Sequence, residues 1–255
     1  MNLIDTHCHL YLPEYASDLA EVIKRASLAG VEKFYLPAID SSSRSALLRL
    51  EKEFPGKCVA MTGLHPCSVK EDYQTELKIV EDSLEKRTFA AVGEVGLDFY
   101  WDSTFAPEQY LAFHQQIEWA LHYHVPVILH SRDSLDQTIE IIREHQNGNL
   151  IGIFHCFSGS PESARQIIEL GFYLGIGGVV TYKNAGLDKT LKHIDLRYMV
   201  LETDAPYLTP VPFRGKRNES SYLKYIVDKL AIIKEVSSEE VANITTENAR
   251  KIFGH

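Results

Sequence analysis

Short apolar segments alternate with amphipathic segments along the chain, and this alternation limits the folds open to it. Eight of the apolar segments are rich in β-branched and aromatic residues and are often bounded by glycine or proline, as strands are. They are residues 2–7, 31–38, 57–64, 89–95, 125–131, 151–155, 172–177 and 198–203. Strands that alternate with helices form a parallel sheet with right-handed crossovers. Eight such units predict an α/β fold, a single (β/α)8 TIM barrel, and 255 residues suit one such domain over 1–255.

Helical patterns fill the intervals between these strands. Residues 15–29 and 107–123 carry apolar side chains at helical spacing, and Pro107 suits the start of the second helix. Ser134 and Pro161 mark two further helix starts. The chain from residue 221 onward predicts two more helices, of which the last is capped near Ser237.

A doubly wound open sheet is the structural alternative to the barrel. The first strand–helix junction lacks the glycine-rich phosphate loop that such folds use to bind dinucleotides, so we favour the barrel. The strand at 172–177 has the least support, because Gly175 and Gly177 disfavour regular pairing.

Composition and charge limit the class of protein. The N-terminus lacks the basic start and apolar run of a signal peptide, and no segment is apolar for long enough to span a membrane. We therefore expect a cytoplasmic protein with no membrane association and no obligate protein partner. Its four cysteines show no CxxC spacing and predict free thiols. The net charge of −9 argues against an extended grip on duplex DNA, although a local metal cluster with a few arginines could still hold a phosphodiester.

The segment DTHCHL near the N-terminus is the strongest local signal of chemistry. Side chains two residues apart on an extended chain point the same way, so His7 and His9 can converge on one metal ion. By itself, such a pair is equally consistent with two structural histidines at the surface or at the edge of a core.

Four more potential metal ligands lie at the ends of later strands. Glu94, His130 and His155 close the fourth, fifth and sixth strands, and Asp204 follows the eighth. The carboxyl ends of barrel strands meet at one face, where barrel enzymes assemble their sites. With His7 and His9, these residues supply six nitrogen or oxygen ligands, more than one tetrahedral ion uses. The set therefore predicts two divalent ions bridged by the two oxygens of Glu94.

The motifs resemble those of the TatD-type metal-dependent deoxyribonucleases, which belong to the amidohydrolase-like barrel superfamily. The resemblance runs along nearly the whole chain and rests on DTHCHL (5–10), GLHP (63–66), GEVGLDFY (93–100), HSRD (130–133), HCFSG (155–159), ETDAPYL (202–208) and RGKRNE (214–219). It implies a two-metal phosphodiesterase that acts on DNA. It also implies one metal site at His7, His9, Glu94 and Asp204, and a second at Glu94, His130 and His155.

The chain departs from the usual family pattern at two positions. Cys67 stands where a second histidine is common, and Ser220 follows RGKRNE where proline is common. Both changes bear on loop shape or substrate preference and leave the predicted metal ligands intact.

Several polar residues near the strand ends are candidates for contact with substrate. His65 could contact the scissile phosphate or a metal-bound water, and Arg132, Arg214 and Arg217 could pair with phosphate oxygens. Each of the four could instead be a solvated or salt-bridged side chain. For Lys216, in the same RGKRNE motif, a solvated or salt-bridged side chain is the interpretation that we favour.

Other residues beside the predicted ligands have structural explanations. Asp98 is a candidate to orient a histidine ligand. Tyr100 and Trp101 could stack on an exposed base, although aromatic residues after a strand are more often packed, and we favour packing here. Cys8 points away from His7 and His9 on an extended chain, so packing is also the expectation for it and for Cys156.

The predicted activity is hydrolysis of a DNA phosphodiester from single strands or frayed ends. Glu94 and Asp204 are the predicted catalytic residues, with Asp204 as the general base. The ligands suit Mg²⁺, Zn²⁺ or Mn²⁺. Hydrolysis of a small amide, lactone or phosphoester is the rival hypothesis, because related barrels reuse similar clusters for many substrates, and metal storage without catalysis is a third.

Overall fold

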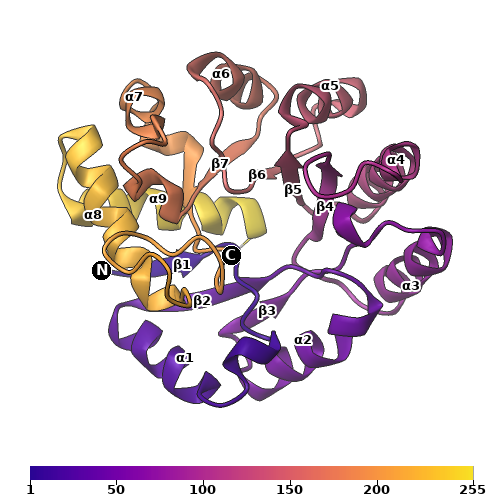
Figure 1. Ribbon diagram of the computed structural model, residues 1–255, viewed down its shortest axis with the longest axis horizontal. Helices are drawn as coiled ribbons and strands as arrows, with labels where there is room; N and C mark the ends of the chain where they lie inside the picture. The colour runs from indigo at the N-terminus through magenta and orange to yellow at the C-terminus, as the bar shows by residue number, and fades with distance from the viewer. Residues whose placement is uncertain (255) are drawn as a thin grey trace.

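Parallel strands form a ring at the centre of the computed structural model, which describes residues 1–254 (Figure 1). The strands are β1 (Leu3–Asp5), β2 (Val31–Leu36), β3 (Cys58–Ala60), β4 (Val92–Asp98), β5 (Val127–Arg132), β6 (Gly152–Phe154), β7 (Tyr173–Ile176) and β8 (Met199–Leu201). They pair in the order β1-β2-β3 and β4-β5-β6-β7-β8. Parallel bridges between Thr62 and Val92 and between Cys8 and Ala205 join the two groups at both seams. The predicted (β/α)8 TIM barrel is confirmed.

Helices surround the ring and connect successive strands (Figure 1). They are α1 (Leu19–Leu28), α2 (Ser41–Glu53), α3 (Tyr73–Lys86), α4 (Ala106–Tyr123), α5 (Leu135–His145), α6 (Pro161–Glu169), α7 (Leu187–Lys192), α8 (Leu223–Lys234) and α9 (Ser238–Phe253). Short 3-10 turns lie at Pro13–Tyr15, Pro66–Ser68, Gly178–Thr181, Leu196–Tyr198 and Ser220–Tyr222. None of the helices in this described part of the chain is long and apolar enough to cross a membrane.

Most predicted helix starts agree with the structure. Pro107 lies in the first turn of α4, Pro161 begins α6, and the Ser237 hydroxyl accepts a hydrogen bond from the amide of Glu240 at the start of α9. The helix predicted at 15–29 begins later, at Leu19, because the chain first makes a 3-10 turn. Ser134 precedes α5 as expected, but its hydroxyl donates to the carbonyl of Leu97 instead of capping the helix.

Strand β4 lies three residues later than predicted, and this shift changes the position of Glu94. The prediction ended the strand at residue 95, whereas pairing with β5 continues to Asp98. Glu94 therefore lies inside β4, at a shift in register between Gly93 and Val95. Such a bulge turns a side chain away from the regular alternation of the strand.

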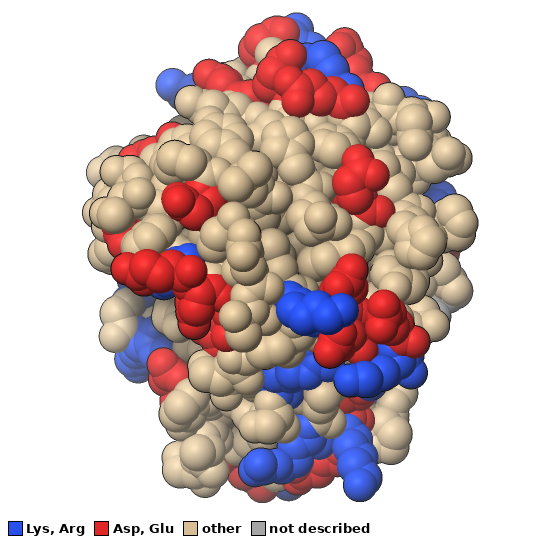
Figure 2. Space-filling model, turned by 90° about the vertical axis from the view of Figure 1, so that its right-hand side faces the viewer, with Lys and Arg blue, Asp and Glu red and all other residues tan. Residues whose placement is uncertain are grey.

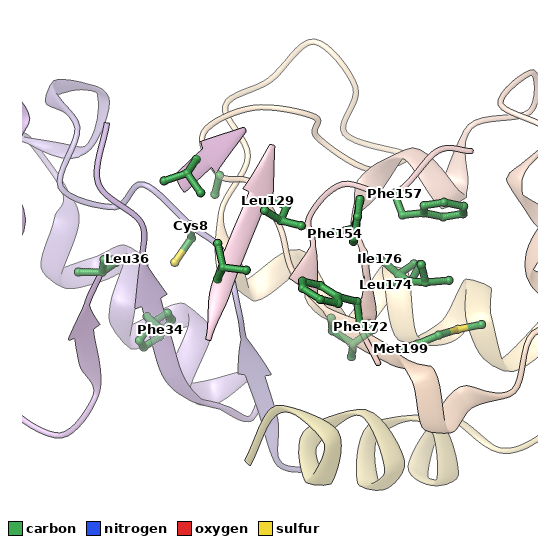
Figure 3. Packing of buried hydrophobic residues seen from close by; sticks show 14 of the residues in the cluster. Cys8, Phe34, Leu36, Leu129, Phe154, Phe157, Phe172, Leu174, Ile176 and Met199 are labelled. Carbon is green, nitrogen blue, oxygen red and sulfur yellow. The ribbon is translucent and has the colours of Figure 1, made fainter. Parts of the chain in front are cut away.

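Two apolar layers hold the barrel together. One lies between the strands and the outer helices and includes Phe34, Phe154 and Phe172 (Figure 3). The other fills the inside of the barrel with residues in or beside the strands, and α9 packs against it. Phe253 of α9 stacks on Tyr35 of β2 with 3.7 Å between ring centroids. The last helix thus closes the amino-terminal end of the barrel, and the carboxyl end stays open.

The structure confirms two further predictions, the free cysteines and the strand at 172–177 that had the least support in the sequence. All four cysteines are free thiols, as expected, and Cys8 is buried in the core (Figure 3). The strand predicted at 172–177 is present as β7 despite its glycines. A Cβ atom on Gly175 would come within 2.3 Å of a carboxylate oxygen of Glu202, so the glycine makes room for that buried side chain.

Candidate metal centre

The ends of β1 and β8 run side by side at the open end of the barrel. The amide of Thr6 donates to the carbonyl of Leu201, and the amide of Asp204 donates to the carbonyl of His7 at 2.9 Å. Asp204 has a left-handed backbone with φ of 55°, which aspartate tolerates better than most residues. This pairing brings Asp204 next to the two histidines of DTHCHL, although nearly 200 residues separate them in the sequence.

The two oxygens of Glu94 face different histidines. Oε2 lies 3.1 Å from Nε2 of His7 and 3.6 Å from Nε2 of His9. Oε1 lies 2.7 Å from Nδ1 of His130 and 3.0 Å from Nε2 of His155. Asp204 adds Oδ1 at 3.6 Å and 3.5 Å from the inner nitrogens of His7 and His9. The structure therefore brings together the six side chains singled out in the sequence.

Three of these imidazoles are held by hydrogen bonds from the ring nitrogen that points away from Glu94. Nδ1 of His9 lies 2.9 Å from the hydroxyl of Tyr11, which itself donates to the carbonyl of Pro37. Nε2 of His130 lies 2.9 Å from Oδ2 of Asp98, as proposed from the sequence. Nδ1 of His155 lies 3.2 Å from Oε1 of Glu202. Such partners fix which nitrogen carries the proton and therefore which nitrogen presents a lone pair.

The lone pairs that result converge on carboxylate oxygens, which are also acceptors. Once Asp98 and Glu202 take the outer N–H groups of His130 and His155, the inner nitrogens of the neutral rings face Oε1 of Glu94. Two acceptors this close repel each other unless a proton or a cation lies between them. The donor set of imidazole nitrogens and carboxylate oxygens thus fits divalent ions.

The pKa values of Glu94, His155 and His7 are all shifted by burial and by the close contacts within the cluster. Burial raises the pKa of Glu94, but His155, His7 and His65 outweigh this and hold it well below the usual value. Burial lowers the pKa of His155, yet Glu94 and Glu202 raise it well above the usual value. The pKa of His7 is lowered, mainly by burial. Glu94 is therefore ionised at neutral pH and stabilises positive charge at the centre.

His65 also reaches the cluster, with Nε2 at 3.4 Å from Oε1 of Glu94. Its other nitrogen, Nδ1, accepts a hydrogen bond from the amide of Cys67 at 3.0 Å. The neutral ring consequently carries its proton on Nε2 and presents a donor, not a lone pair, to the centre. The contact uses the main chain of Cys67, so the replacement of the usual histidine at that position does not disturb it.

The three candidate arginines differ in where they lie. Arg132 ends β5 and lines a cavity of about 710 Å³ that opens over His130, His155 and Asp204. Arg214 stacks on the ring of Tyr182, with 4.2 Å to the centroid. Arg217 forms two hydrogen bonds with the carboxylate of Asp18, at 2.8 and 2.7 Å. This ion pair is the structural alternative considered for Arg217, and we favour it over the predicted contact with substrate.

The sequence analysis missed Tyr11 and Glu202 as residues that orient the cluster. Tyr11 lies only two residues after His9, in the turn that follows it, and this closeness in sequence was a usable signal. Glu202 lies in the quoted motif ETDAPYL, but its contacts to His155 and to the amide of Cys156 cross from β8 to β6. Its partner could not be identified from spacing alone.

Fold and site together define a metal-dependent hydrolase of the barrel type. The family model described as TatD related DNase matches residues 4–254, and the chain belongs to this family. It is 39% identical over 252 residues to YabD of Bacillus subtilis strain 168, named an uncharacterized metal-dependent hydrolase, and covers 98% of both chains. It is 30% identical over 257 residues to the 3'-5' ssDNA/RNA exonuclease TatD of Yersinia pseudotuberculosis, covering 98% of this chain and 99% of that protein. The solved structure of YjjV from Escherichia coli K12 superposes with a TM-score of 0.93 at 30% identity and covers 99% and 98% of the two chains.

Proposed function

We propose that this protein hydrolyses phosphodiester bonds of DNA from strand ends, with two divalent ions held on either side of Glu94. The observation that carries the proposal is the division of the Glu94 carboxylate, whose Oε2 faces His7 and His9 while Oε1 faces His130 and His155. One carboxylate shared in this way is the arrangement that a two-metal site needs.

The proposed ligand sets are those that the family resemblance implies, and the distances to the two oxygens of Glu94 support them, although His155 also lies close to His7 and Asp204. His7, His9, Glu94 and Asp204 would hold one ion, and Glu94, His130 and His155 would hold the other. Mg²⁺, Zn²⁺ and Mn²⁺ all accept such ligands. When bound, two such ions would lower the pKa of an attacking water and would neutralise charge that develops on the phosphoryl group.

Asp204 is the proposed general base. Its side chain is 14% exposed and lines the cavity, whereas the side chains of Glu94 and His7 are almost fully enclosed. Burial raises the pKa of Asp204, but a hydrogen bond with His9 and the charge of His155 lower it overall. Asp204 is therefore ionised at neutral pH and positioned to accept a proton from a water molecule in the cavity.

His65 and Arg132 are the proposed contacts to the scissile phosphate. His65 directs an N–H donor toward the centre, and Arg132 lines the same cavity with a guanidinium group suited to phosphate oxygens. Arg214 is a candidate for a neighbouring phosphate. We assign these contacts to His65, Arg132 and Arg214 from where the side chains lie and from the hydrogen-bond donors that they carry.

Shape and charge support single strands or frayed ends as the substrate. Most of the proposed ligands are buried at the floor of the cavity, so we expect a stacked duplex to reach them only after its end unpairs. On the face drawn in Figure 2, acidic side chains are spread over the whole height, and basic ones gather mainly in the lower half, mixed with acidic ones. A net charge of −9 likewise disfavours extended duplex binding. The activity named for the Yersinia relative, on single-stranded DNA and RNA, is in line with this choice.

A time course on end-labelled DNA tests the proposal. The metal-loaded protein should release mononucleotides stepwise from a single strand and act more slowly on a blunt duplex, while Asp204→Asn serves as the matched inactive control. Random internal cuts in duplex DNA would contradict the proposed end preference. No cleavage of DNA together with rapid turnover of a small amide, lactone or phosphoester would favour the rival substrate class.

A further inference from the structure

The loop between β4 and α4 carries two large aromatic side chains that do not pack into the core. Tyr100 is 52% exposed and Trp101 is 69% exposed, contrary to the packing expected for aromatic residues after a strand. Their rings meet edge to face, with centroids 4.9 Å apart. Exposure of two adjacent aromatic side chains next to a cavity is typical of a ligand-binding surface.

These aromatic residues lie on a loop that is fixed to the metal centre. Oδ1 of Asp98 accepts hydrogen bonds from the amides of Tyr100 and Trp101 at 3.0 and 3.1 Å. Oδ2 of the same carboxylate holds His130. Further along the same loop, Asp102 forms an ion pair at 2.8 Å with Lys70, which lies outside the loop. The aromatic pair therefore has a defined position relative to His130.

Arg132 connects the aromatic pair to the cavity. Its guanidinium carbon lies 4.0 Å from the ring centroid of Tyr100 and 5.5 Å from that of Trp101. The same side chain lines the cavity over the metal centre, two residues after His130. The guanidinium thus lies over the ring of Tyr100 and close to the more exposed ring of Trp101, and aromatic rings combined with a cation bind stacked bases and their phosphates in single strands.

We infer that Tyr100, Trp101 and Arg132 form a stacking platform for a nucleobase of single-stranded DNA beside the scissile phosphate. The inference rests on the proposed nuclease function and names the part of the substrate that the exposed residues recognise. A stacked base needs no specific hydrogen bonds, so the platform would accept any of the four bases. It would also favour unpaired strands, since bases in a duplex already stack on one another.

Fluorescence gives a direct test, because the chain has only two tryptophans. Trp119 is buried in α4 and can be replaced by Trp119→Phe, which leaves Trp101 as the reporter. Phosphorothioate-linked hexathymidylate, which resists cleavage, should quench this variant of the metal-loaded protein. The same backbone with abasic spacers should quench much less. Absence of quenching by the thymidylate, or equal quenching by both probes, would overturn the inference even if the protein cleaves DNA.

Kinetics provide an independent test. The ratio of kcat/KM on single-stranded DNA to kcat/KM on bis(p-nitrophenyl) phosphate, a diester without a base, should fall about ten-fold in Trp101→Ala, mainly through KM. Trp101→Phe should recover most of the ratio, and Leu111→Ala, an exposed apolar residue of α4, is the matched control. A parallel loss on both substrates would show a structural role and contradict the platform. If the wild-type protein cleaves no DNA, the proposed function fails, and the quenching result still decides the platform.

Discussion

The two sides of Glu94 differ in how they meet solvent. The Oε2 side contains His7 and His9, whose side chains are 0% and 4% exposed, together with Asp204, which is 14% exposed and lines the cavity. The Oε1 side includes His65 and His130, at 13% and 16%, and opens into the cavity. Their orienting partners differ too, because neutral Tyr11 holds His9 while the carboxylate of Asp98 holds His130. The comparison indicates that the two histidines of the Oε2 side are enclosed and that Asp204 is its exposed member, whereas His65 and His130 are partly exposed on the Oε1 side and His155 is 5% exposed.

Replacement of Glu94 should have the largest effect, because its carboxylate faces the histidines of both sides. Glu94→Ala should lose both ions and reduce kcat by about three orders of magnitude or more, since two-metal stabilisation supplies several kcal/mol. Metal content after dialysis and steady-state kinetics measure these effects. Glu71→Ala, an exposed carboxylate, is the control. Retention of one full equivalent of metal would show that Glu94 does not bridge.

Single histidine replacements should separate the two sides. His130→Ala is expected to lose the ion on the Oε1 side, keep the other and change the melting temperature little, because its side chain is partly exposed. His7→Ala should lose the ion on the Oε2 side and also lower the melting temperature, because the substitution leaves a buried cavity. Metal analysis and thermal unfolding of the two variants, compared directly, check this. An equal fall in melting temperature in both variants would contradict the expectation that the buried His7 contributes more to stability than the partly exposed His130.

The orienting partners give a smaller effect. Asp98→Asn keeps the shape of the side chain but removes its charge, and should weaken metal binding by about 10- to 100-fold, as loss of such partners does. Tyr11→Phe removes a neutral hydrogen bond of about 1 kcal/mol, so a loss of about five-fold is expected. Titration of metal into each variant measures the affinities. A Tyr11→Phe effect as large as that of Asp98→Asn would show that charge does not distinguish the two partners.

The smallest effect concerns Arg217, which lies in the segment between β8 and α8 and is paired with Asp18. Arg217→Ala should change KM for single-stranded DNA by less than about two-fold and lower stability by about 1 kcal/mol or less, as expected for a partly exposed ion pair. Arg214→Ala, in the same loop, should raise KM more and leave stability unchanged. Steady-state kinetics and thermal unfolding distinguish them. A large KM increase in Arg217→Ala alone would mean that Arg217 leaves Asp18 to bind substrate.

Much of the site could be located from the sequence because the barrel imposes a rule on position. Once eight strands alternate with helices, the carboxyl ends of the strands meet at one face. His7, His9 and His155 lie just beyond such ends and His130 lies near the end of β5, two residues before Arg132, so their convergence followed without knowledge of any distance. Glu94 was placed at a strand end, whereas the structure places it at a register shift inside β4. The prediction of its neighbours survived because the bulge still turns it toward the centre.

The alternation of segments thus determined the barrel and the face on which the polar residues meet. Only the tertiary structure decided that Oε2 and Oε1 of Glu94 face different histidines, that Glu202 orients His155 and that Arg217 pairs with Asp18. Those contacts join segments far apart in the chain, and they depend on strand register, the β4 bulge and the space left by Gly175. Periodicity is a local property of the chain and fixes which face a side chain points to. The particular atom it meets is set by the packing of distant segments, which local spacing does not specify.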